Sequence, residues 1–145
     1  MTTIEKTIEI EAPVERVFDF VTDWQNMSSF MEGTYDWKPT TDKTRGDGTR
    51  VAHKQKGLFR EIGYECEVSG FVENEGFTIT SFKGPEARSQ WVFERLDDKA
   101  KVTLIVGYKV PVPIVGGILD ALLVKRMSET MFDKSLQNLK RLLEG

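Results

Sequence analysis

The feature that most constrains this chain is a change of hydrophobic period before its last thirty residues. From residue 34 to residue 110, apolar and polar side chains alternate, which is typical of half-buried strands. From about Ile114 to Glu144 the apolar residues recur every three or four positions, which predicts one long helix. At 1.5 Å per residue, about 28 helical residues span roughly 40 Å, enough to cross a whole sheet.

The rest of the chain supplies the sheet. A strand precedes Pro13, and two short helices fill the stretch between Pro13 and Gly33. The clearest later strand puts Ile62, Tyr64, Cys66 and Val68 on one face and carboxylates on the other. We therefore predict an α+β fold: a seven-stranded, curved, antiparallel sheet wrapped on the C-terminal helix, with two short helices after strand 1.

Composition narrows the function classes. The 145 residues suit one domain, 1–145, and the net charge of −3 argues against a nucleic-acid partner. One cysteine cannot form an internal disulfide, and no export signal is expected at the N-terminus. The apolar window Val110–Val124 contains prolines, glycines and Asp120 and is too short to span a bilayer. We expect a cytoplasmic protein with no stable membrane insertion.

Three segments together resemble a known superfamily. They are IEIEAPVERVFDFVTDWQNMSSF, RGDGTRV and YKVPVPIVGGILDALLVKRMSETMFDKSLQNLKRLLE. The chain resembles the START-like, SRPBCC or Bet v-like superfamily, and within it the polyketide cyclase/dehydratase-like group. The resemblance implies a helix-grip fold around a ligand cavity, makes a cyclase or dehydratase activity possible, and leaves the ligand open.

Metal and nucleotide chemistry are disfavoured by missing residues. A two-histidine iron site or a structural zinc site needs more ligands than His53 and Cys66 provide. Phosphate-binding GxxxxGK[ST] and GxGxxG motifs are absent, as is the GxSxG serine elbow. We expect no metal and no cofactor.

The candidate chemistry lies on the inward face of the sheet. A tight hairpin at Leu58–Phe59 would set His53 opposite Tyr64 and Val51 opposite Cys66. His53 and Tyr64 are then candidates for acid–base catalysis, although a role as amphipathic wall residues is the favoured interpretation. A Cys66–His53 nucleophilic pair is a weaker hypothesis, because nothing supplies an orienting third group.

The predicted ligand-binding surface combines inward strand residues with one face of the C-terminal helix. For each aromatic residue, lining a pocket and packing in the core are alternatives. Arg126 is expected to reach the cavity mouth and pair with a ligand carboxylate. The predicted residues are Tyr35, Trp37, Val51, His53, Tyr64, Cys66, Ile79, Trp91, Phe93, Val106, Tyr108, Leu119, Leu122, Leu123, Arg126 and Met127.

Two segments have competing interpretations. The helix start around Gly116 and Gly117 is either buried, which we favour, or a hydrophobic portal for a lipid-like ligand. The stretch Lys38–Arg60, with seven Lys and Arg against two Asp, is better interpreted as a solvated hairpin face than as an anion site.

Three functions remain possible. The first, which we favour, is binding and transport of a small hydrophobic molecule such as a lipid, isoprenoid, quinone or polyketide-like ring. The second is a cyclase/dehydratase-type enzyme. The third is a protein-interaction module without a ligand, whose partner the sequence does not name.

Overall fold

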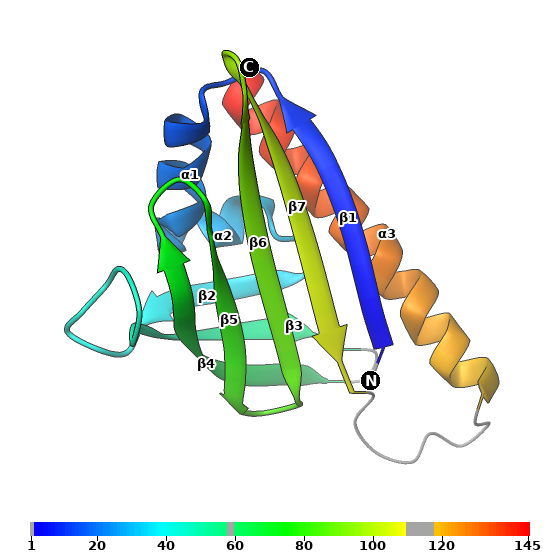
Figure 1. Cartoon of the computed structure of the whole chain (residues 1–145). Coiled ribbons are helices and arrows are strands. Elements are labelled where there is room, and N and C mark those ends of the chain that lie inside the picture. The colour runs from blue at the N-terminus through cyan, green and yellow to red at the C-terminus, as the bar shows by residue number, and fades with distance from the viewer. Residues whose placement is uncertain (1, 58–59, 110–117) are drawn as a thin grey trace.

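The protein is described as a computed structural model covering residues 2–57, 60–109 and 118–145, with side chains of the last range from residue 121 on. Seven strands and three helices form in the predicted order (Figure 1). Their bounds are β1 Thr2–Ile10, α1 Val14–Thr22, α2 Trp24–Phe30, β2 Thr34–Pro39, β3 Arg50–Lys56, β4 Glu61–Val72, β5 Gly76–Lys83, β6 Ala87–Leu96, β7 Lys99–Tyr108 and α3 Ile118–Glu144.

The strands form one antiparallel sheet in the order β1-β7-β6-β5-β4-β3-β2. Strands β2 to β7 follow one another as a meander, and β1 adds to the far edge by pairing with β7 from Thr2 opposite Tyr108 to Ile10 opposite Ala100. The first two strands of the chain therefore lie at opposite edges of the sheet.

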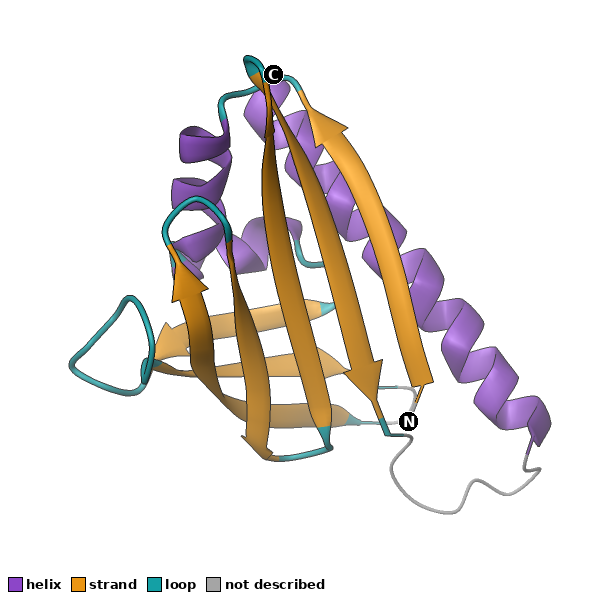
Figure 2. Cartoon of the chain, viewed as in Figure 1, coloured by secondary structure: helices purple, strands orange, loops and turns teal. Residues whose placement is uncertain are grey.

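Strong curvature comes from irregular strands. In Figure 1, β2 and β3 run across the direction of β6 and β7. The long strand β4 has two register shifts against β5, between Glu65 and Cys66 and between Ser69 and Val72, with Gly70 at φ +59°. Such irregularities bend a strand and increase its twist. The bent β4 thus joins the two halves of the sheet, with the concave face toward the helices (Figure 2).

The helices close the concave face unequally. Helix α1 buries Val14, Val17, Phe18 and Val21, the positions that the helical spacing predicts. Helix α3 buries its C-terminal half through Phe132, Leu136, Leu139 and Leu143. In Figure 1 the N-terminal half of α3 diverges from β1. The predicted helix-grip fold is confirmed, with one end of the grip more open than the other.

Candidate ligand-binding site

The concave face has two parts. One is filled by packed apolar rings and is called the dry half, and the other carries polar side chains and is called the polar half. In the dry half, rings from α1, α2, β5 and β6 pack together, with Phe18 and Phe93 in edge contact at 5.0 Å between centroids. Trp91 is 1% exposed and contacts Phe30, while Phe93 is 3% exposed. Of the two interpretations offered for Trp91 and Phe93, core packing therefore applies, because α1 and α2 cover them.

The polar half carries a stack of three aromatic rings from β2, β3 and β4. The imidazole of His53 lies between the rings of Trp37 and Tyr64, with centroid distances of 3.9 Å and 4.9 Å and interplanar angles of 5° and 6°. The predicted pairings, His53 with Tyr64 and Val51 with Cys66, are both present. Trp37 Nε1 donates a hydrogen bond to Thr34 Oγ1 at 2.8 Å, which holds the outer ring of the stack.

Two buried polar atoms stand out, one in the polar half and one on β7. Both His53 Nδ1 and the Tyr108 hydroxyl are buried and unpaired among the residues that the structure describes. Tyr108 ends β7 on the same parity as the buried residues Leu104 and Val106. Because buried polar groups are nearly always paired, each such atom needs an explanation. Thr49 Oγ1 and Asn74 Oδ1 share this property elsewhere in the chain.

The polar half is uncharged near neutral pH. Burial lowers the pKa of His53 to about 4, so its imidazole is neutral. Burial is also the main reason why the pKa of Cys66 is raised to about 12 and that of Tyr64 is raised. A protonated thiol does not act as a nucleophile, which counts against a Cys66–His53 pair. Ile79 and Val106 are buried apolar residues of the same concave face.

Tyr35 lies on the opposite face from the one predicted. The alternation put Tyr35 and Trp37 together, but Asp36 between them has φ +56° and the β2–β3 register shifts there. This bulge reverses the parity, so Tyr35 sits opposite Lys54 and its hydroxyl donates a hydrogen bond to the Glu61 carboxylate. That contact is the main cause that raises the Tyr35 pKa to about 12. Tyr35 is therefore no part of the concave surface.

The predicted contribution of α3 to the cavity is also wrong for its described side chains. Leu122, Leu123 and Met127 are 43%, 53% and 46% exposed, and Arg126 is exposed as well. At 3.6 residues per turn, Leu123 projects about 180° and Met127 about 140° around the helix from the buried Phe132. The side chain of Leu119 and the proposed portal at Gly116 and Gly117 lie outside the described residues.

In the basic stretch Lys38–Arg60, most of the side chains that form ion pairs are exposed. Lys54 pairs with Asp36 and Glu61, and Arg50 pairs with Glu67. These contacts fit the favoured interpretation of a solvated hairpin face. A hollow of about 350 Å³ includes His53 and Tyr64, but its lining is dominated by charged residues. It therefore differs from the apolar cavity that we predicted. The other lining residues are Asp36, Lys38, Ala52, Lys54, Gly63, Glu65 and Lys83.

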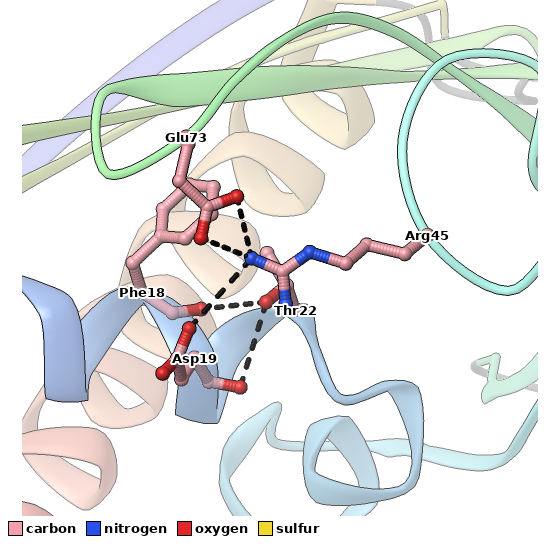
Figure 3. Close-up of polar contacts among 5 residues, drawn as sticks. All are labelled: Phe18, Asp19, Thr22, Arg45 and Glu73. Atoms are coloured by element: carbon pink, nitrogen blue, oxygen red, sulfur yellow. Dashed lines mark hydrogen bonds and ion pairs between the residues drawn. The ribbon is translucent and has the colours of Figure 1, made fainter.

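Sequence reasoning missed the role of Arg45, which lies in the loop between β2 and β3. Its Nη2 lies 2.6 and 2.7 Å from the two carboxylate oxygens of Glu73 and 3.7 Å from Asp19 (Figure 3). The guanidinium also sits over the rings of Phe18 and Phe71 at 5.7 and 5.4 Å. Arg45 thus ties this loop to α1 and to the β4–β5 turn. No local sequence signal distinguishes it from the other cations of the loop.

Within the described ranges, no group of three His, Cys, Asp or Glu side chains is placed to hold a metal ion. No helix among the described residues is long and apolar enough to cross a membrane.

Comparison with known proteins gives one family and many similar folds. The model of a family described as polyketide cyclase / dehydrase and lipid transport matches residues 1–144. The comparison with curated proteins gave no match. A crystal structure of TTHA0849 from Thermus thermophilus has a TM-score of 0.83 at 20% identity, covering 97% of this chain and 95% of that one.

Two further structures share the fold. The di-domain ARO/CYC BexL from the BE-7585A biosynthetic pathway has a TM-score of 0.73 at 18% identity, covering 97% of this chain and 46% of its own. Ara h 8.0201 has a TM-score of 0.63 at 15% identity, with 95% and 97% covered. At these identities the likeness concerns the fold alone.

Proposed function

The chain belongs to the polyketide cyclase/dehydrase and lipid-transport family, and on that premise we propose that it binds and carries a small, mostly apolar molecule. One observation supports this most: His53 Nδ1 and the Tyr108 hydroxyl are buried on the concave face with no partner in the described part of the chain. An unpaired buried polar group costs about 1–3 kcal/mol, and a ligand that pairs with it removes that cost.

The chemistry of the polar half suggests the kind of ligand. Trp37, Tyr64, Ile79 and Val106 offer apolar and aromatic contacts, as in most small-molecule sites. Neutral His53 and the hydroxyl of Tyr108 suit an uncharged polar group, such as the hydroxyl or carbonyl of a lipid, isoprenoid, quinone or polyketide-like ring. Arg126, the residue predicted to pair with a ligand carboxylate, is exposed on α3.

The observations favour binding over proton transfer. His53 and Tyr64 stack face to face, and no hydrogen bond joins them. Burial lowers the pKa of His53 to about 4, which makes the imidazole a weak base. We therefore propose a carrier and assign no residues to the cyclase activity that the family also includes.

The test is native mass spectrometry of the full chain purified from its own host. We expect a co-purifying molecule that is retained by the protein and by Tyr35→Phe, whose hydroxyl lies on the outer face. His53→Ala and Tyr108→Phe should each retain less of it, by about tenfold for a lost hydrogen bond of roughly 1.4 kcal/mol. Absence of any bound molecule, or equal retention by all variants, contradicts the proposal.

A further inference from the structure

The N-terminal half of α3 presents an apolar surface that the sheet does not cover. We call Leu122, Leu123, Arg126 and Met127 the α3 patch. Its three apolar side chains are each more than two-fifths exposed, whereas Phe132, Leu136, Leu139 and Leu143 further along the helix are buried. Leu123 and Met127 project away from the buried stripe, so α3 cannot bury them against this sheet together with that stripe.

Two exposed cations lie in and beside the α3 patch. Residues 121–128 contain Lys125 and Arg126 and no acidic residue, although Asp120 directly precedes them. Both cations are exposed, and neither forms an ion pair with another described residue. The acids of the following turn, Glu129 and Asp133, share one partner cation, Lys6 of β1, and point toward the sheet edge that carries it. Arg126 follows Leu122 by four residues and Leu123 by three, so it shares their side of the helix.

A second copy of this chain is a poor occupant for this surface. A stable protein interface takes about 20–30 residues from each side, far more than the α3 patch offers. In a symmetric dimer the same patch would meet itself and bring Arg126 close to its own equivalent. A surface of opposite charge that accepts a few apolar side chains fits better.

We propose that the α3 patch docks the protein on the surface of a bilayer containing anionic lipids. Leucine and methionine side chains would enter the boundary between headgroups and acyl chains, and Arg126 and Lys125 would lie among the lipid phosphates. The docking is peripheral, because no described helix is long and apolar enough to span a membrane. This inference does not depend on the identity of any ligand inside the grip.

The experiment measures co-sedimentation of the full chain with vesicles of phosphatidylcholine alone and of phosphatidylcholine mixed with phosphatidylglycerol. We expect binding to the mixed vesicles that weakens as salt is added. The double variant Leu122→Ser/Leu123→Ser should bind at least roughly tenfold more weakly. Arg126→Glu should bind at least about fivefold more weakly, because it removes and then reverses one surface charge.

Matched controls lie on other elements than the α3 patch. Val72→Ser removes an apolar side chain that is 50% exposed on β4, and Arg16→Glu reverses an exposed cation on α1. Both should bind like the unchanged protein. The proposal is overturned if neither vesicle binds the protein, or if the variants and controls bind alike. It is also overturned if light scattering shows a dimer that Leu122→Ser/Leu123→Ser dissociates.

Discussion

The imidazole of His53 lies flat against the indole of Trp37, with ring centroids 3.9 Å apart and planes 5° from parallel. On its other face His53 meets Tyr64, so the ring is held on both sides. Only the edges of the imidazole remain for polar contacts, and Nδ1 on one edge is buried with no partner within residues 2–57, 60–109 and 118–145. The stack therefore fixes the orientation of a neutral hydrogen-bonding group.

Acidification should destabilise the protein through His53. Its pKa is about 4 when folded and 6.5 as a free side chain, so the unfolded chain takes up the proton first. This part of the stability is fully present above pH 6.5 and is lost as the pH falls toward about 4, by up to about 1.4 kcal/mol per pH unit. Urea unfolding at several pH values measures it. His53→Gln should remove this slope and keep the part due to carboxylates; an unchanged slope contradicts the assignment.

Tyr108→Phe should not cost stability in the ligand-free protein. Among the residues of known placement the buried hydroxyl has no partner, so its removal relieves an unpaired group and is neutral or stabilising by about 1 kcal/mol. Thermal unfolding of the ligand-free proteins measures the difference. A loss of stability greater than about 1 kcal/mol would show that the hydroxyl has a partner.

Cys66 should resist alkylation while the protein is folded. Its side chain is 4% exposed, and its pKa is raised from 9.0 to about 12, which lowers the thiolate fraction by about a thousandfold. Mass spectrometry after iodoacetamide treatment, with and without urea, measures the two rates. Similar rates in both conditions would show that the thiol is accessible.

Arg45 and Glu73 should be coupled only weakly, because both side chains are about half exposed. A double-mutant cycle with Arg45→Ala and Glu73→Ala should give a coupling of about 0.5 kcal/mol. Arg45→Ala should cost more than Glu73→Ala, since it also loses the contacts with the rings of Phe18 and Phe71. Equal losses of stability in the two variants would show that the ring contacts do not contribute. The exposed Arg50–Glu67 pair is a second test, because Arg50 also lies over a ring, that of Phe82, at 4.5 Å.

Gly84→Ala should be among the most damaging glycine changes. Gly84 has φ +90°, and an added Cβ would lie 2.3 Å from the carbonyl oxygen of Gly63, so backbone must move. Gly48→Ala has a similar φ of +85° with no atom within 4 Å and should cost about 1–2 kcal/mol. Urea unfolding should give a much lower free energy of unfolding for Gly84→Ala than for Gly48→Ala. Equal losses would show that backbone conformation alone decides the cost.

Much of the fold could be predicted because alternation and a short hairpin determine register. The pairings of His53 with Tyr64 and of Val51 with Cys66 follow from the pattern of β3 and β4 alone. Tyr35 could not be placed in the same way. A single residue with positive φ, Asp36, reverses the parity, and an aspartate is not a specific sequence signal for a bulge.

The site was harder to predict because parity indicates a face and not what covers it. Trp91 and Trp37 both point inward and both are buried. Phe30 of α2 packs on Trp91, whereas Trp37 stacks on His53, and parity alone predicts neither contact. On α3, the interpretation of the apolar residues as one stripe is wrong for a reason that the sequence already contains. The helical period places Leu123 about 180° from Phe132, so the two cannot face the sheet together.

The pairing of β1 with β7 sets the order in which this molecule is completed. Thr2 has its partner in Tyr108, so β1 cannot pair until nearly the whole sheet has been synthesised. Helix α3, which packs on β1, comes later still. Contacts between residues so distant in the chain slow folding. We therefore expect the meander of β2 to β7 to form first, and the grip to close only after α3 has been synthesised.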